Sequence, residues 1–405
     1  MRRLAALSLV LVFCTCQRSY AYGPAFSRLY AAADSAEIAS SNPAAMTRFD
    51  QSTTSLGLTF YNSFKEFEVD ESRTTTSGGD PDSGSPIFIP AYYTIRPMGE
   101  KWRFGFSANA TGGFGSENGS SWAGRYYSNE FSLAFIGLSP SLAYPVNDKL
   151  SLGFSVPVTI SHSETTSVIN SPIPGADDGK LEVEYTEASH SYVFSSLYEF
   201  SEKTRAAFIY RSEVDFDSDP DVDIKRYSLP SDVINRIEDA IDTLEVSIKQ
   251  PQSISLGLFH QLDNGWQLTA DALWVDFSEF GVTEISIVGQ TVVSPDSNFK
   301  DIYVFSVGAQ LPVEGDTIWR IGALYVSPAV DDEDRTFSFA LDRVYGVGVG
   351  LQRELSGGNA YSFNLNLLDT GKAPVDTGDD PVRGRVAGEN KNHYSISLDY
   401  AFHWR

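Results

Sequence analysis

The chain has 405 residues, and its 53 acidic against 30 basic side chains give a formal net charge of −23. Such an acidic chain does not suit nucleic-acid binding, because a phosphate backbone is held by clustered Lys and Arg side chains. Both cysteines, Cys14 and Cys16, lie within the first 21 residues. The remainder of the sequence therefore carries no thiol, which excludes disulfides, cysteine nucleophiles and Cys-ligated zinc there.

Residues 1–21 have the pattern of a secretory signal peptide. Two arginines follow Met1, and an apolar stretch then runs over residues 4–14. Ser19 and Ala21 supply the small side chains three and one positions before a cleavage point. Because the apolar stretch is too short to span a bilayer as a helix, export of the remaining chain is the better interpretation.

Residues 22–50 do not alternate as a strand would, and they are too few to form a domain of their own. They are rich in Ala and Ser, and they end in a turn around Asn42-Pro43-Ala44. Apolar side chains within them, such as Phe26 and Ile38, nevertheless need burial. We predict an N-terminal hatch that folds into the lumen of a barrel, and a periplasmic tail is the alternative.

Apolar and polar residues alternate from about residue 51 to the C-terminus. This period of two predicts half-buried strands. Many of the runs reach about ten residues, which is longer than a usual soluble strand and suits a tilted crossing of a bilayer. In segment 202–217, the predicted apolar face consists of Ala206, Phe208, Tyr210, Val214 and Phe216.

The strands are joined alternately by short turns and by long loops that hold most of the acidic residues. This pattern is typical of a transmembrane antiparallel β-barrel, whose closure satisfies every backbone hydrogen bond in lipid. The predicted fold class is therefore all-β, with one barrel domain of about 14 strands over residues 51–405. The predicted strands are 52–64, 86–97, 101–115, 129–146, 148–163, 187–200, 202–217, 245–261, 264–276, 299–313, 316–328, 340–355, 359–371 and 391–404.

Two segments depart from this simple pattern. Gly112-Gly113-Phe114 lies inside the third strand, where glycine marks either a bulge or a strand end that frays into its loop. In the loop 218–244, apolar residues recur at intervals of three and four and predict an amphipathic helix. Its apolar face either packs on the barrel rim or walls an external hydrophobic groove. That face includes Val233, Ile234, Ile237 and Ile241.

No constellation in the sequence predicts catalysis or metal binding. The five histidines are not spaced as metal ligands. Ser189 and His190 are adjacent on a strand and point to opposite faces, so they cannot act together as nucleophile and base. The acidic run 215–223 fails as a calcium loop because Pro220 stands where glycine is needed. We expect no enzyme activity, no metal and no cofactor.

Several motifs resemble those of the FadL/TodX family, the outer-membrane transporters of long-chain fatty acids and other hydrophobic compounds. The most specific is Asn42-Pro43-Ala44, within the stretch 32–49. The segments 122–126, 138–144, 210–212, 251–257 and 268–274 are also similar. The resemblance implies a fourteen-stranded barrel with an N-terminal hatch, in the outer membrane of a Gram-negative-type bacterium.

The resemblance also implies site residues. Phe26, Asn42, Pro43 and Ala44 would gate the lumen as parts of the hatch. The strand at Gly112-Gly113-Phe114 would kink inward, touch the hatch and leave a lateral gap through which an apolar ligand reaches the lipid. The helix 229–244 would help to form the groove that first binds the ligand.

The predicted function is passive uptake of hydrophobic small molecules, above all long-chain fatty acids, with hatch gating and lateral release. The expected partners are a fatty acid-like ligand, outer-membrane lipid and lipopolysaccharide, and the expected state is a monomer. Two alternatives remain open from the residues: a non-specific porin for polar solutes, and a structural or adhesive barrel with acidic surface loops. A barrel-embedded hydrolase is disfavoured by the missing catalytic constellation.

Overall fold

The computed structural model describes residues 30–81, 86–171, 177–218, 221–225, 244–287, 290–293, 298–313, 315–337, 342–381 and 383–405. Over these residues, no helix is both long enough and apolar enough to cross a membrane. The predicted signal peptide, residues 1–21, lies outside the described residues.

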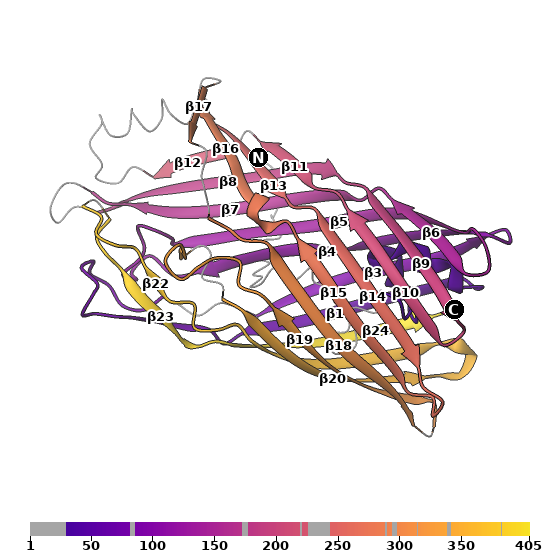
Figure 1. The fold of residues 1–405 in the computed structure, drawn as a ribbon. Coiled ribbons are helices and arrows are strands. Elements are labelled where there is room, and N and C mark those ends of the chain that lie inside the picture. Colours follow the sequence, from indigo (N-terminus) through magenta and orange to yellow (C-terminus); the bar gives the residue numbers. More distant parts are fainter. Residues whose placement is uncertain are drawn as a thin grey trace, which may run out of the picture.

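Long antiparallel strands close into a single barrel (Figure 1). β1 pairs with β3 on one side and with β24 on the other, so the first and last barrel strands meet. β6 and β7 share one pass across the wall, as do β8 and β9, and the described residues thus confirm the predicted fourteen-stranded barrel. The strands of the wall are β1 (Thr53–Ser63), β3 (Ile87–Met98), β4 (Trp102–Glu117), β5 (Glu130–Pro145), β6 (Leu150–Ser155), β7 (Val158–Ile169), β8 (Gly179–His190), β9 (Val193–Ser201), β10 (Thr204–Arg211), β14 (Ser253–Gln261), β15 (Gln267–Val275), β18 (Ile302–Val313), β19 (Thr317–Val326), β20 (Val344–Glu354), β21 (Ala360–Asp369) and β24 (Tyr394–Trp404).

The remaining strands lie toward the long-loop end, which is the outer end in barrels of this type. One sheet of four strands contains β11 (Val214–Ser218), β13 (Leu244–Gln250), β16 (Gly281–Ile287) and β17 (Gln290–Val293). A second, three-stranded sheet contains β2 (Glu66–Val69), β22 (Val375–Asp376) and β23 (Ala387–Asn392). β12 (Asp221–Lys225) pairs with β8. The short helices are α1 (Ile38–Ser41), η2 (Pro43–Arg48), η3 (Phe277–Glu279) and η4 (Ser356–Gly358).

Four predicted strands are interrupted. The segment 187–200 divides between His190, where β8 ends, and Val193, where β9 begins. The segment 148–163 divides into β6 and β7 at Pro157, which has no N–H to donate to a neighbouring strand. The segment 245–261 divides at Pro251 for the same reason. The segment 202–217 divides after Arg211, and the alternation changes phase there.

The phase change corrects the predicted apolar face of the segment 202–217. Phe208 is 43% exposed on the outer surface, whereas Phe216 is 1% exposed in the interior, together with the buried Val214. Ser212 and Glu213 lie outside any strand, so the parity of the side chains is not carried from β10 into β11. The prediction that Val214 and Phe216 share the face of Phe208 was therefore wrong.

The outer surface of the barrel is apolar, as a wall in contact with lipid requires. Large exposed side chains, including Phe88, Leu256, Val307 and Val347, alternate with buried ones along the strands. Exposed Trp102, Trp266 and Trp319 lie beside the short turns, as a girdle at the periplasmic interface would.

The interior contains two large apolar clusters. The inner cluster joins buried residues of the segment 30–50 with inward-facing residues of β3, β5, β9, β10, β14 and β24. The outer cluster is formed by strands of the outer half and includes Phe135, Phe216, Phe277, Phe280 and Leu324. An apolar lining therefore extends above the N-terminal segment toward the long loops.

Candidate functional site

Residues 30–50, hereafter the N-terminal segment, lie inside the periplasmic half of the barrel, where Figure 1 shows them in indigo beside β6 and β9. Asn42 ends α1, and its side-chain Nδ2 donates to the carbonyl oxygen of Tyr30 over 2.7 Å. Pro43 opens η2, a position for which its fixed φ is suited. The turn at Asn42-Pro43 therefore fastens the segment into one compact unit.

Glycines of the wall allow the backbone of the N-terminal segment to approach closely. A Cβ atom added to Gly105 of β4, Gly153 of β6 or Gly257 of β14 would lie less than 3.0 Å from atoms of the segment. At Gly153 those atoms are the backbone nitrogen of Ala44 and the carbonyl carbon of Pro43, which cannot move aside as a flexible side chain can. Glycine is therefore required at position 153, where the backbone of the segment touches β6.

Polar side chains of the wall bind the backbone of the same segment. Arg205 of β10 donates to the carbonyl oxygens of Ala31 and Ala32, each over 2.9 Å. Arg103 of β4 donates to the carbonyl of Phe49 over 2.6 Å. Two further contacts join Arg211 to the carbonyl of Ser40 over 3.2 Å and the amide of Ala44 to Ser195 Oγ over 2.9 Å.

Ion pairs also hold the N-terminal segment against the wall. Asp34 accepts hydrogen bonds from Arg320 of β19 over 3.1 Å and from Gln310 of β18 over 2.9 Å. Arg48 pairs with Glu199 of β9 over 2.6 Å. Because three wall strands, β10, β14 and β15, separate β9 from β18, these pairs hold the segment at well-separated points of the wall.

The predicted gating residues are only partly placed. Asn42, Pro43 and Ala44 are buried together against β6 and β9. Phe26 lies outside the described residues, as do the predicted groove residues Val233, Ile234, Ile237 and Ile241. Gly112 and Gly113 lie in β4, and the side chain of Phe114 is outside the described part of the chain.

β4 carries a bulge at the predicted position. Its register with β5 shifts between Ala110 and Gly112, so Thr111 is the extra residue. Gly113 has φ of 151°, a conformation that favours glycine. The glycine run thus marks a bulge, as one of the two sequence interpretations predicted.

The wall also changes at this bulge. Within the described residues, the β3–β4 register ends at the pair Ala91–Asn109, although β4 stays paired with β5 as far as Glu117. β3 in turn stays paired with β1 as far as Ile87. The outer half of β4 therefore parts from β3, and Gly112 lies near the side chain of Gln250, which belongs to β13 across the barrel.

A small polar cavity lies where the bulge, the N-terminal segment and β10 meet. Ser40 Oγ donates to Asn109 Oδ1 over 3.4 Å at this point. The outer apolar cluster begins at Ala110 and Phe135, so the polar cavity lies directly beside the apolar lining of the outer half. The cavity is lined by Ser40, Asn109, Ala110, Thr111, Thr159, Ser191, Arg211 and Gln250.

The family model described as outer membrane protein transport protein (OMPP1/FadL/TodX) matches residues 15–363 of the chain. The chain belongs to this family. It is 24% identical over 417 residues to the long-chain fatty acid transport protein of Escherichia coli (strain K12), a match that covers 93% of this chain and 88% of the relative.

Two solved structures share the fold. A Pseudomonas aeruginosa FadL homologue is similar with a TM-score of 0.77 and 17% sequence identity, over 91% of this chain and 93% of the homologue. The toluene transporter TbuX of Ralstonia pickettii is similar with a TM-score of 0.65 and 18% identity, over 96% and 97% of the two chains.

Membership of the FadL/TodX family confirms the predicted resemblance and the predicted location in the outer membrane of a Gram-negative bacterium. The members of this family are outer-membrane transporters of hydrophobic compounds rather than enzymes. The barrel, its apolar lining and the filled lumen are the structural counterparts of that function.

The arginines that hold the N-terminal segment were not among the predicted site residues. The signal was present, because a basic residue on the lumenal face of a strand must find a buried partner. The arginines concerned are Arg103, Arg205, Arg211 and Arg320.

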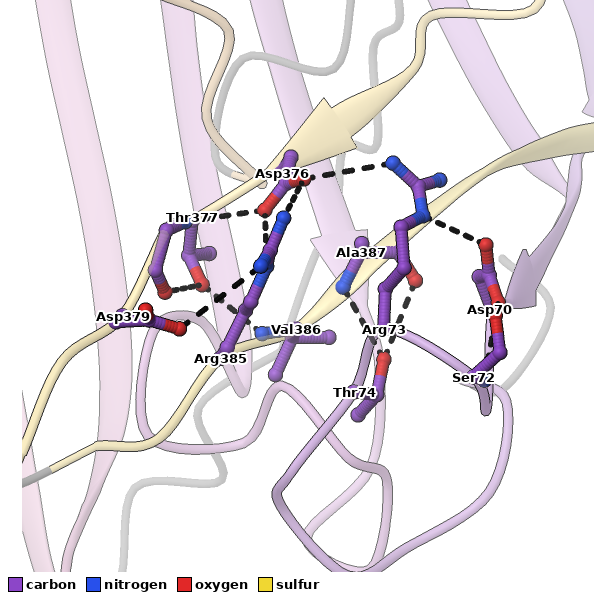
Figure 2. A network of polar contacts seen from close by, with 11 residues as sticks. Asp70, Ser72, Arg73, Thr74, Asp376, Thr377, Asp379, Arg385, Val386 and Ala387 are labelled. Atoms are coloured by element: carbon purple, nitrogen blue, oxygen red, sulfur yellow. Dashed lines mark hydrogen bonds and ion pairs between the residues drawn. The ribbon is translucent and has the colours of Figure 1, made fainter.

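A compact structure at the outer end, the outer cap, joins the first and last long loops (Figure 2). Arg73 bridges Asp70 over 2.7 Å and Asp376 over 3.4 Å, and Arg385 pairs with Asp376 over 2.7 Å. Hydrogen bonds from Ser72 and Arg73 lower the pKa of the Asp70 carboxyl to about 2.

Besides this polar network, the outer cap has an aromatic core of Phe67, Trp122 and Phe337. Among the described residues, no group of three or more His, Cys, Asp or Glu side chains could hold a metal ion. Asp70, Asp376 and Asp379 of the outer cap pair with arginines.

Proposed function

We propose that this protein takes up hydrophobic small molecules, above all long-chain fatty acids, by passive diffusion. In this proposal the N-terminal segment is the gate, and the ligand leaves sideways into the membrane beside β4. The observation that carries the proposal is the end of β3–β4 pairing at the bulge that meets the segment. An open backbone edge in the wall is costly in lipid, so its retention at this place needs a function.

The route follows the polarity of the interior. An apolar molecule partitions from the outer end into the lining of the outer cluster, since apolar surface is favourably removed from water there. The N-terminal segment blocks the axial path below it. The parting of β3 and β4 offers an exit to lipid without passage through periplasmic water.

The polar cavity favours an amphipathic ligand over a purely apolar one. Arg211 and Gln250 can bind a small anionic head group, while the tail remains in the apolar lining. The Escherichia coli relative, a long-chain fatty acid transport protein, agrees with such a ligand. A toluene-like ligand would use the lining alone.

The remaining parts of the proposal concern assembly and surroundings. We infer a monomer whose outward-facing apolar side chains contact outer-membrane lipid and whose loops contact lipopolysaccharide. The N-terminal segment in the lumen disfavours a non-specific porin, because it occupies the path that polar solutes would take. An adhesive function would not explain why β3 and β4 part.

Gly113→Glu tests the lateral exit. A long charged side chain at the bulge would occupy the parted wall and repel an apolar ligand, so uptake by cells should fall at least about tenfold. Binding of a long-chain fatty acid to the purified protein should survive, because the apolar lining is intact. Gly79→Glu is the matched control, since Gly79 lies in an outer loop with open space around it.

Normal uptake by Gly113→Glu cells, at equal surface abundance, would show that the ligand does not leave beside β4. The periplasmic end would then be the exit. If Gly113→Glu abolished both fatty acid binding and uptake, the substitution would instead act on the binding site.

Arg211→Gln tests the head group. Loss of a charge-assisted hydrogen bond, worth about 1.5–3 kcal/mol, should weaken binding of hexadecanoate about tenfold or more. Binding of hexadecanol, which has no charge, should change little. Arg211→Lys retains the charge and should restore part of the difference. Equal losses for the acid and the alcohol, measured by calorimetry, would exclude a head-group role for Arg211.

A further inference from the structure

The N-terminal segment meets two unlike walls. Toward β4, β6 and β14 it packs through glycine contacts and apolar side chains. Toward β18, β19 and β24 it meets buried polar side chains, which include Gln310, Arg320 and Asp399. The segment reaches this polar wall through two acidic side chains, Asp34 and Glu37.

Asp34 is well paired on the polar wall. Its carboxylate accepts from both Gln310 and Arg320, and Arg320 also donates to Gln352. The positive charge of Arg320 is thus paired with the carboxylate of Asp34.

Glu37 is placed differently. Its Oε1 atom is buried and has no hydrogen-bond partner, whereas its carboxyl group takes part in a hydrogen bond with Ser35. The negative groups that act on it are Asp34, in its own segment, and Asp399 of β24. Arg320 of β19 is the positive group, and it is already bound to Asp34.

An ionised Glu37 would therefore place a further negative charge in a site that already holds two acidic side chains and one arginine. Burying a charge without a partner is costly, so the site favours the neutral carboxyl. His403 of β24 lies within electrostatic range of Arg320 and Asp34 but adds no second positive partner to Glu37.

We propose that Glu37 is a proton-operated latch for the N-terminal segment, which is held against β19 and β24 while the carboxyl is neutral and released when it ionises. The Asp34–Arg320 ion pair is the attachment beside the latch. The proposal rests on the proposed gating role of the segment for its biological meaning, but the latch itself is a property of the structure.

The direction of the effect follows from the proton balance. Burial and the nearby Asp34 raise the pKa of Glu37 well above 4.5 in the seated segment. A displaced, hydrated carboxyl would return to its ordinary pKa. The equilibrium between the seated and the displaced segment therefore favours the seated state most strongly below about pH 4.5. As the pH rises from there to the pKa of the seated carboxyl, this equilibrium constant falls by about tenfold for each pH unit.

The test measures exposure of the segment directly. Ser41→Cys introduces a buried thiol of similar size into α1 of the protein, which has no other cysteine after residue 16. The rate of its reaction with a maleimide is compared, from pH 5 to pH 8, with and without Glu37→Gln. The ratio of the two rates removes the part of the thiol titration that the two proteins share.

We expect a ratio near one at pH 5, and a reaction about tenfold or more faster in the protein that retains Glu37 at pH 8. Glu202→Gln is the control, because Glu202 is an exposed carboxylate in a turn at the same end of the barrel. That variant should leave the ratio near one at every pH.

A ratio that does not change with pH would overturn the latch. So would faster labelling of the Glu37→Gln protein at pH 8, since ionised Glu37 would then be holding the segment through Arg320. The result is independent of the uptake assays. A pH-dependent ratio with normal uptake in Gly113→Glu cells would retain the latch and remove the lateral exit.

Discussion

Gly153→Leu is expected to expel the N-terminal segment from its seat and to convert the barrel into an ion-conducting pore. Any Cβ at this position meets the backbone of Pro43 and Ala44, and it also displaces Ser195 Oγ, which holds the amide of Ala44. Overpacking against rigid atoms costs about 1–3 kcal/mol or more. Leucine adds further atoms where the seat has no room for them.

Single-channel recording in a planar bilayer is the measurement. We expect long-lived openings from the variant and near silence from the parent protein, because the segment fills the periplasmic half of the lumen. Gly79→Leu provides a control, since the same side chain is added in open space at the outer end. A silent Gly153→Leu barrel would show that the segment adjusts to β6 rather than leaving it.

Trp122→Ala is expected to loosen the outer cap while the barrel stays folded. Trp122 is 1% exposed, stands edge-on to Phe337 at 4.8 Å between ring centroids, and donates to the carbonyl of Ser128 over 2.8 Å. Truncating a buried tryptophan costs about 3–5 kcal/mol. Amides of β2 and β23 should therefore exchange with solvent roughly a hundredfold faster or more.

Arg385→Ala is the matched comparison in the same structure. Its ion pair with Asp376 lies at the surface, where water and salt screen the two charges and such pairs contribute little to stability. Hydrogen exchange in β23 should rise by no more than about fivefold. If Arg385→Ala loosened the outer cap as much as Trp122→Ala, the polar network of Figure 2 rather than the aromatic core would hold it together.

The barrel could be predicted from the sequence because its lipid-facing surface and its packed lumen both impose a pattern on neighbouring residues of each strand. Lipid on one side and a packed lumen on the other force alternation, as in Leu365 and Leu367 against Asn364 and Asn366. This alternation no longer predicts the faces of the side chains where a strand is interrupted. Nothing local reveals that the parity of the side chains changes between Arg211 and Val214, because the change depends on how the outer sheet of β11 and β13 meets the wall.

The seat of the N-terminal segment was only partly predictable. Asn42-Pro43 indicates a turn by its residue types, and the turn is present. The partners of that turn are far away in the sequence: Ser195 is 151 residues from Ala44, and Gln310 is 276 residues from Asp34. Such pairings depend on the register of the closed barrel, which a single sequence does not display.

The contact of arginine side chains with backbone carbonyls has a consequence for biogenesis. Arg103, Arg205 and Arg211 would face the lumen without those carbonyl acceptors if the wall closed around an empty interior. Arg205 would retain the ring of Phe259, 3.8 Å from its guanidinium carbon to the ring centroid, and the charge of Glu199 on β9. The N-terminal segment precedes every strand in the chain, so it can be in place before β24 joins β1. The strands would then assemble around the segment, which would serve as an internal template while the barrel closes.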